Sequence, residues 1–274
     1  MTEKKSKGRT VFLIVWIALI LILLAAILII GLSPGHEESI KQVMKDGVLH
    51  NENRIALFGR TVNPALISAY IVTAVLLLAA VIIRIFAIPR FKYVPGKFQA
   101  VIEKMVEFFA DMARTNSPHK TGFVGAYIFG AGLYIFFGTL FELFGIQANT
   151  TKGMPIALPA PIADINSAIA MGVMSYAVIL GAGFISNGVK GGLKVLKDFS
   201  LPISMSFRLF GALLSGLLVT ELVYYYVALS FVLPVIVGVL FTIMHALIQT
   251  YVLTTLVSTF YGEAVEPRKR KTDS

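Results

Sequence analysis

The chain has 274 residues, of which 57% are hydrophobic and only 14% are charged. Uncharged runs of twenty or more residues exclude an ordinary soluble domain and predict an all-α polytopic membrane protein. The net charge of +9 does not indicate nucleic-acid binding, because Lys and Arg lie in short segments that flank the apolar runs, as in cytoplasmic loops facing anionic lipid. The absence of Cys excludes disulfides and thiolate chemistry.

The first predicted span is the uncharged run 11–32, which follows a segment rich in Lys and Arg. A cleaved signal peptide is the alternative, but the run is too long for its hydrophobic region and no small-residue cleavage site precedes Pro34. We therefore expect a retained anchor whose amino end is cytoplasmic. Residues 33–64 are polar, include a helical patch at 40–48, and are expected on the outer side. Residues 1–64 thus form an amino-terminal membrane anchor and outer loop.

The second predicted span, residues 65–89, returns to the cytoplasm, where Arg84, Arg90 and Lys92 form its basic flank. A helix then opens at Gly96, and its apolar residues recur at i, i+3 and i+4 spacing. That face is expected to lie in the plane of the membrane interface. Its members are Phe98, Val101, Ile102, Met105, Val106, Phe109 and Met112.

Two further spans are predicted at about 121–146, which carries Glu142, and at about 165–186. A proline-rich outer loop separates them, and a short basic loop with Lys190, Lys194 and Lys197 follows the second. From 199 to 262 only Arg208, Glu221 and His245 interrupt the apolar sequence, which is too long for one crossing. We expect a long tilted hairpin with its turn near 230–234 and a basic cytoplasmic tail. This makes about six membrane helices with both termini cytoplasmic.

The most informative residue is Arg208, because a charge at membrane depth costs several kcal/mol and a guanidinium does not lose its proton. At 100° per residue it shares a helix face with small residues, which allow another backbone to approach closely. These are Ser204, Gly211, Ala212 and Ser215. A tight contact within one chain, with a local acid as partner, is one interpretation. Glu221 lies about 20 Å further along and on the other side of the helix, so it cannot pair with Arg208 within that helix. The second interpretation is therefore that Arg208 pairs with a carboxylate on another subunit.

Residues 204–211, read as S-x-S-x-R-L-F-G, resemble the core of subunit a of bacterial F-type ATP synthases, the stator channel beside the rotating ring of c subunits. Three further stretches agree: P-G-K-F-Q with I-E at 95–103, A-D-I-N at 163–166, and I-Q-T-Y-V at 248–252 followed by Y-G-E-A at 261–264. The resemblance covers about residues 65–266 in the family's order. Residues 267–274 form a basic tail outside it.

The resemblance implies an ion-translocating stator subunit of the Fo sector in a bacterial plasma membrane, the ion being taken as a proton. Two offset half-channels would lead to the ring, with Arg208 between them and Gln249 facing it from the last helix. The implied partners are the c ring, a b-type peripheral stalk, membrane lipid and, indirectly, the F1 sector. No cofactor, metal or nucleotide site is expected in this chain, which has no G-x-x-x-x-G-K-[ST] loop.

Polar residues at membrane depth are the candidates for the ion pathway. They are Thr139, Glu142, Asp164, Asn166, Glu221 and His245. Several have simpler interpretations: Asp164 as a helix cap, Glu142 as a solvated acid near a helix end, and His245 as a core histidine bonded to a carbonyl. Departures from the family pattern at Ala212, Leu217 and Lys194 leave the exact ion route open.

Two other functions remain possible on the sequence alone. A secondary transporter would use Arg208 to bind an anionic substrate inside the membrane. A degenerate relative would serve as a membrane anchor that no longer conducts. Passive ion conduction distinguishes the second from a channel subunit, and a saturable small-molecule site near Arg208 would favour the first.

Overall fold

The computed structural model describes residues 14–22, 25, 54–57, 59–151, 153, 155–225 and 233–267. Within these residues, five helices are long and apolar enough to cross a membrane, which confirms the predicted all-α polytopic fold. Of the first predicted span, residues 14–22 and 25 are helical. The rest of that span, the helical patch at 40–48 and the basic tail from residue 268 lie outside the described residues.

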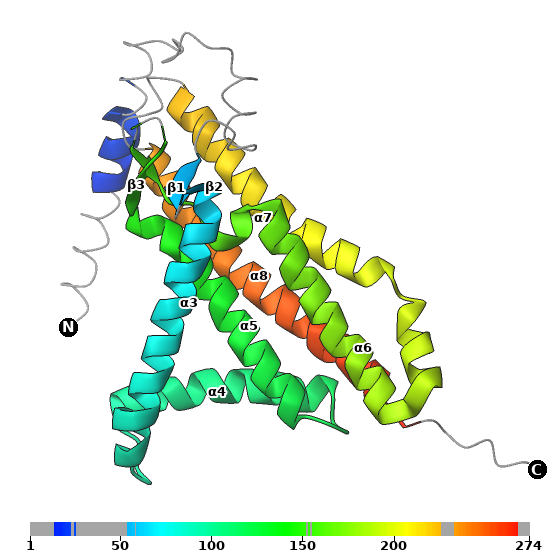
Figure 1. Cartoon of the computed structure of the whole chain (residues 1–274). Coiled ribbons are helices and arrows are strands. Elements are labelled where there is room, and N and C mark those ends of the chain that lie inside the picture. Colours follow the sequence, from blue (N-terminus) through cyan, green and yellow to red (C-terminus); the bar gives the residue numbers. More distant parts are fainter. Residues whose placement is uncertain are drawn as a thin grey trace, which may run out of the picture. The chain divides into compact units, whose positions relative to one another are not determined.

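The chain forms two compact units, residues 51–214 with 242–274 and residues 1–50 with 215–241. The larger unit contains four complete helices and parts of two more (Figure 1). The complete ones are α3 (Pro64–Ile82), α4 (Lys97–Asn116), α5 (Gly122–Leu140) and α6 (Ile165–Leu196). Both α7 (Ser200–Tyr225) and α8 (Leu233–Val265) contribute residues to each unit.

Helix α3 begins at a defined cap, and the membrane span that it opens ends next to a proline. The Asn63 side chain accepts a hydrogen bond from the Ala65 N–H at 3.0 Å, and Pro64 occupies the first turn, where its missing N–H costs nothing. Toward Pro89 the helix changes to a π-helical turn, η1 (Ile83–Ala87), and a 3-10 turn, η2 (Ile88–Arg90). The span Pro64–Arg90 matches the predicted one, and only 6% of its most apolar window is buried.

The amphipathic helix predicted after Gly96 is α4, which runs across the foot of α3 and α5 in Figure 1. Its apolar face divides into two halves. In the second half, the Phe109 ring packs edge-on against Phe129 of α5, with centroids 5.6 Å apart, and Met112 accepts a 3.7 Å hydrogen bond from Thr255 of α8. In the first half, three predicted members of the face stay exposed: Phe98, Val101 and Val106. Its location at the membrane interface stays a prediction.

Helix α6 reverses direction at Gly188, whose φ of 63° and ψ of −158° are open to glycine and strained for other residues. Residues 189–196 form a second helical arm, and the Tyr176 hydroxyl of the first arm donates to the Val195 carbonyl at 3.2 Å. The prediction of a basic loop after residue 186 is therefore wrong. Lys190 and Lys194 lie in this second arm because one glycine suffices for the turn.

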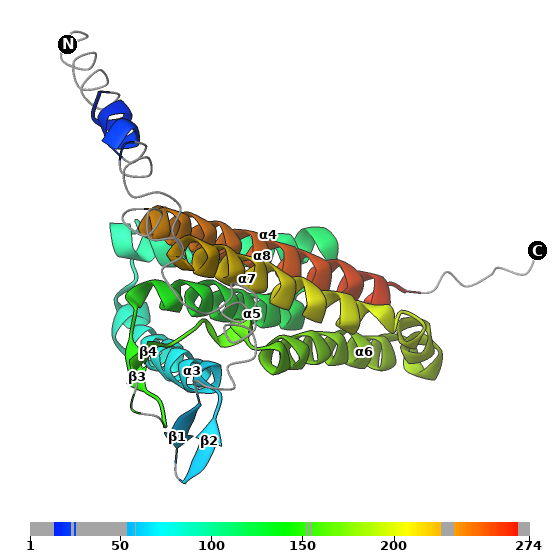
Figure 2. The same ribbon diagram turned by 90° about the horizontal axis from the view of Figure 1, so that it is seen from above.

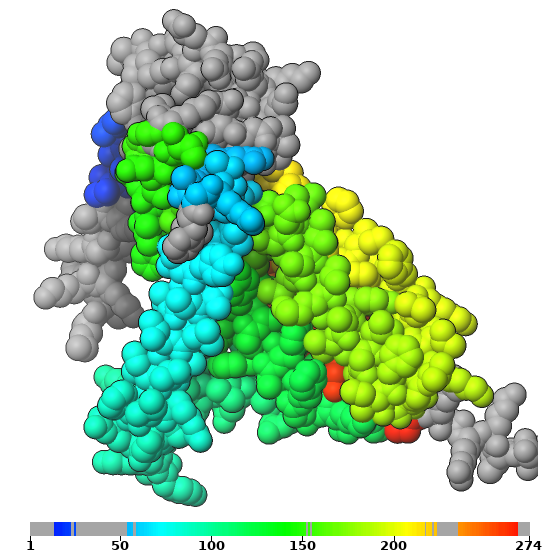
Figure 3. Space-filling model, in the orientation of Figure 1, coloured from blue at the N-terminus to red at the C-terminus, as the bar shows by residue number. Residues whose placement is uncertain are grey.

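The long hairpin predicted at the carboxyl end corresponds to α7 and α8, although residues 226–232, which include most of the predicted turn, lie outside the described part. Within the larger unit the two helices lie side by side (Figure 2). In the space-filling view of Figure 3 the last residues of α6 and the start of α7 form the yellow-green edge of the molecule.

Two short antiparallel hairpins were not predicted. Strand β1 (Ile55–Leu57) pairs with β2 (Arg60–Val62), and β3 (Gln147–Asn149) pairs with β4 (Pro155–Ala157). Each strand has three residues, which is too short for alternation of polar and apolar residues to be visible in the sequence.

Close helix contacts depend on glycines. A Cβ atom at Gly172 of α6 would lie 2.9 Å from the Pro202 carbonyl oxygen and 3.1 Å from the Ser206 nitrogen of α7. A Cβ atom at Gly132 of α5 would lie 2.6 Å from the Phe109 ring. Since membrane helices gain little from the hydrophobic effect among themselves, such close backbone approach is a main source of their association.

We predict that Gly172→Ala lowers stability relative to Gly181→Ala, because nothing lies within 4 Å of a Cβ at Gly181. Both changes gain the same helix propensity, so their difference isolates the steric cost of about 1–3 kcal/mol. Unfolding of both variants by SDS titration, followed by circular dichroism, measures that difference. Equal stability would show that α6 and α7 separate without cost at this point.

Candidate functional site

Arg208 lies on a face of α7 that the described part of its own chain leaves open. Met205, Leu209 and Leu213, spaced by four residues, are buried and form the packed face of the helix. Arg208 itself is exposed. Of the small residues that share its face, Ser204, Gly211 and Ser215 are exposed and Ala212 is half-buried, and a Cβ at Gly211 would meet nothing within 4 Å.

The interpretation of Arg208 as the partner of a local acid finds no support in the described part of the chain. No hydrogen bond or ion pair among the described residues engages its guanidinium, whereas Arg114 pairs with Asp111 at 3.0 Å on the surface of α4. A permanent cation on an apolar span therefore remains without an acid from the part of its own chain that the structure describes.

Gln249 of α8 is the residue that the structure places beside Arg208. Its Nε2 donates a long hydrogen bond of 3.4 Å to the Arg208 carbonyl oxygen, so the amide contacts the backbone of α7 at this residue. The Gln249 side chain is only 5% exposed. Among the described residues, its Oε1 is a buried acceptor that has no partner. An unsatisfied buried acceptor costs about 1–3 kcal/mol, and such atoms often mark functional sites.

His245 lies one turn before Gln249, and both side chains are buried on the same face of α8, as their spacing predicted. Further along α8 lie buried polar residues that no sequence motif indicated as candidates for the ion pathway. Thr250 donates to the Gly132 carbonyl of α5 at 3.4 Å, and the Asn116 amide of α4 donates to Ser258 at 2.9 Å. These bonds join α8 to the helices behind it, so a structural role explains them.

The outer pathway residues do not form a single cluster. Asp164 occupies the N-cap position of α6 without a side-chain cap bond. Its Oδ1 instead accepts hydrogen bonds from the amides of Asn63 at 3.2 Å and Asn166 at 3.4 Å. Asp164 therefore holds the cap position, as the helix-cap interpretation expected, while its carboxylate contacts two amides and not the backbone of the first turn. Asn63 was missed, although an Asn directly before Pro64 is a recognisable helix-start signal.

The remaining pathway candidates lie elsewhere. Thr139 is 1% exposed and donates to the Ile135 carbonyl at 2.7 Å within its own helix. Glu142 lies half-buried in the 3-10 turn η3 (Phe141–Phe144) that ends the third predicted span. Glu221 lies in α7 at a position whose side chain is outside the described part.

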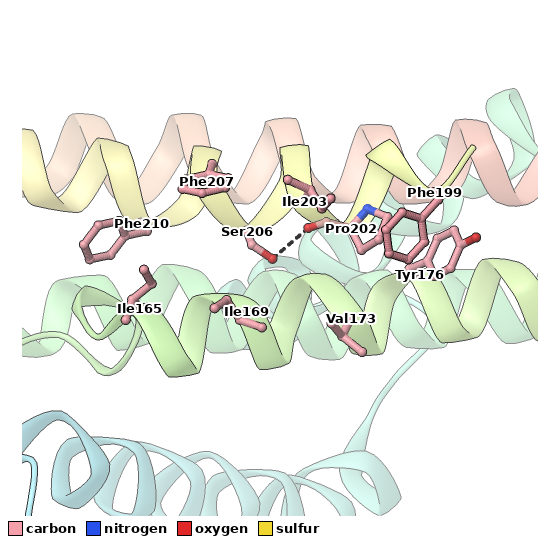
Figure 4. Close-up of a pocket in the computed structure, with 10 residues that line it drawn as sticks. All are labelled: Ile165, Ile169, Val173, Tyr176, Phe199, Pro202, Ile203, Ser206, Phe207 and Phe210. Carbon is pink, nitrogen blue, oxygen red and sulfur yellow. Dashed lines mark hydrogen bonds between the residues drawn. The ribbon is translucent and has the colours of Figure 1, made fainter. Parts of the chain in front are cut away.

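The apolar cavity of about 300 Å³ between α6 and α7 does not belong to this site (Figure 4). Phe210, which lines it, is rotated by about 160° from Arg208 around α7. The Ser206 hydroxyl in its wall already donates to the Pro202 carbonyl at 2.7 Å. Its other walls are predominantly aliphatic and aromatic, so it offers no path for an ion.

A comparison with protein families identifies the chain. Residues 67–262 match the family described as ATP synthase A chain. The chain belongs to this family. It is therefore the Fo subunit a of an ATP synthase, a multi-pass membrane protein that works within the ATP synthase complex. This confirms the resemblance to subunit a of F-type ATP synthases that residues 204–211 and the three further stretches indicated.

We predict that Asn63→Asp makes the stability of this subunit depend on pH. The new carboxylate keeps the cap of α3 but faces the carboxylate of Asp164, so stability is retained while the pair is protonated and falls as the pH rises from about 4 to about 7. Asn63→Ser is the matched control, because it caps without a charge. Thermal unfolding of both variants across this pH range measures the effect, and parallel curves would contradict it.

Proposed function

We propose that this subunit carries ions, taken as protons, across the membrane through two offset half-channels, and that Arg208 separates them. The observation that carries the proposal is an exposed guanidinium on a membrane-spanning helix, on a face of small residues and with no ion pair among the described residues. Such a face suits close passage of a second polypeptide, and such a charge suits an acid on that polypeptide.

The acid is a carboxylate of the rotating c ring. An ion that enters from outside neutralises this carboxylate, so the ring can carry the neutral group through lipid. When the carboxylate returns to Arg208, the positive charge favours its ionised form and releases the proton to the other side. The same charge repels a proton that would cross directly between the half-channels.

An arginine suits this task better than a lysine. A lysine loses its proton readily when desolvated, whereas a guanidinium stays charged and presents several donors to a carboxylate. Each proton that moves down the membrane potential releases about 2.3 kcal/mol of free energy per 100 mV. The free energy released by several protons must therefore be combined to make each ATP.

Gln249 supplies a second polar group at the crossing point. Its contact with the Arg208 carbonyl holds α8 against α7 at the charged residue, and its free Oε1 is available to a donor. His245 lies one turn away, and an imidazole suits proton relay because it can both accept and donate a proton. Glu221 would act on the same outer route.

The outer half-channel would begin at the polar group of Asp164, Asn63 and Asn166, where a carboxylate and two amides meet near the start of α6. Glu142 and Thr139 are the further polar residues proposed for this route. The subunit would have the c ring, the peripheral stalk and lipid as neighbours, with both termini cytoplasmic in a bacterial plasma membrane.

We predict that Arg208→Ala reduces ATP-driven proton pumping to background while the complex still assembles, because the exposed side chain contributes nothing to the packed face of α7. Acidification of inverted vesicles, read by a fluorescent dye, measures pumping. Arg114→Ala removes an equally charged exposed residue and should pump normally. Normal acidification by the Arg208 variant would exclude the mechanism.

We also predict that His245→Ala and Glu221→Gln each slow passive proton flux through F1-stripped vesicles several-fold without abolishing the barrier at Arg208. The rate of dye response after a potassium-diffusion potential measures that flux. Thr242→Val changes another buried polar residue of α8 and serves as the control. Unchanged flux in both variants would remove these residues from the pathway.

A further inference from the structure

A second group of charges lies where α3 ends and α4 begins, in the cyan-to-teal foot at the lower left of Figure 3. A cavity of about 600 Å³ opens there. Its walls come from the last turns of α3, the connecting segment and the first turn of α4. The residues that matter are Ile82, Ile83, Phe86, Arg90, Lys92 and Lys97.

The cavity is strongly cationic. Arg90, Lys92 and Lys97 line it and are exposed, and none of them takes part in an ion pair within the described residues. The sequence from 53 to 102 contains no Asp or Glu at all, so no nearby acid along the chain balances these charges. The first acid after it, Glu103, accepts a hydrogen bond from Gln99 at 2.7 Å.

The cationic rim is held in place by a buried amide. Gln99 is 8% exposed, and its Nε2 donates to the Lys92 carbonyl at 2.7 Å while its Oε1 accepts from the Lys92 N–H at 2.9 Å. These two hydrogen bonds fix the connecting segment to the first turn of α4. The rim is therefore organised before any ligand arrives, which lowers the entropy cost of binding.

The other walls of the cavity are apolar and belong to the membrane-spanning helix. Ile82 and Phe86 are 55% and 58% exposed, and they lie on a span of which 6% is buried in its most apolar window. About 12 Å separates Ile82 from Arg90 along the helix axis. Tyr93 and Val94, beside the rim, are 103% and 79% exposed, as expected of residues that anchor a segment at the headgroup level.

We propose that this cavity binds an anionic phospholipid of the surrounding membrane. The phosphate contacts Arg90, Lys92 and Lys97, and the acyl chains lie along Ile82 and Phe86. A basic pocket at the end of membrane helices is suited to such headgroups. A soluble anion would leave the apolar walls uncovered. An acidic peptide would have to replace lipid along the side of α3, whose apolar residues are suited to acyl chains.

The test compares lipid binding by delipidated ATP synthase complexes in detergent. Phosphatidylglycerol or phosphatidylcholine is titrated in, and the bound lipid is counted by native mass spectrometry. We expect the variant R90Q/K92Q/K97Q to bind the tightest phosphatidylglycerol about a hundredfold more weakly than the natural chain, since each basic residue contributes about fivefold. The control K190Q/K194Q/K197Q removes the same charge from the second arm of α6 and the residue that follows it, and should keep this site.

Equal affinity in the natural chain and the first variant would overturn the proposal. An equal loss in the control would also overturn it, because it would indicate general surface attraction only. If the first variant does not assemble, the natural complex decides: the tightest site must prefer phosphatidylglycerol to phosphatidylcholine and lose that preference in about 1 M salt. No preference would contradict the proposal. Because the readout is lipid binding, it is independent of pumping by Arg208.

Discussion

The structure depends on holding one permanent positive charge, the Arg208 guanidinium, at a defined place on a membrane helix. The packed face of α7, with Met205 and Leu209, positions the backbone, while Arg208 is exposed beside that face. Gln249 then fixes α8 to the carbonyl of the same residue. The energetic cost of the guanidinium in an apolar span is therefore not relieved by an acid within the described part of the chain, and in the proposed mechanism a passing carboxylate relieves it.

The rest of the larger unit supports this arrangement through hydrogen bonds and small residues more than through large apolar side chains. Thr250 bonds to the backbone of α5, and Gly172 lets α6 approach α7 to the distance at which a Cβ would clash. These are the interactions that associate helices when the surrounding lipid is as apolar as the side chains. The polar residues of α8 thus fall into two groups, those that join helices and those near Arg208.

The same chemistry recurs at the foot of α3, with the opposite consequence. There Arg90, Lys92 and Lys97 lie at the end of an apolar span without acids nearby, but they are exposed beside a cavity and not isolated within a span. Charges at that level interact with phosphate groups of lipid, whereas a charge within the span calls for a partner that can enter the membrane with it. The depth of a cation along its helix distinguishes the two roles.

The sequence alone determined the spans, the amphipathic helix and the importance of Arg208, because span length, 3.6-residue periodicity and an isolated charge are properties of consecutive residues. It did not reveal the three-residue strands or the helical arm after Gly188, since strands this short carry no pattern and one glycine can reverse a chain. Only the tertiary structure decided that Gln249 reaches the Arg208 carbonyl and that Asn63 meets Asp164, 101 positions away. Such pairings depend on how helices pack, which local sequence does not encode.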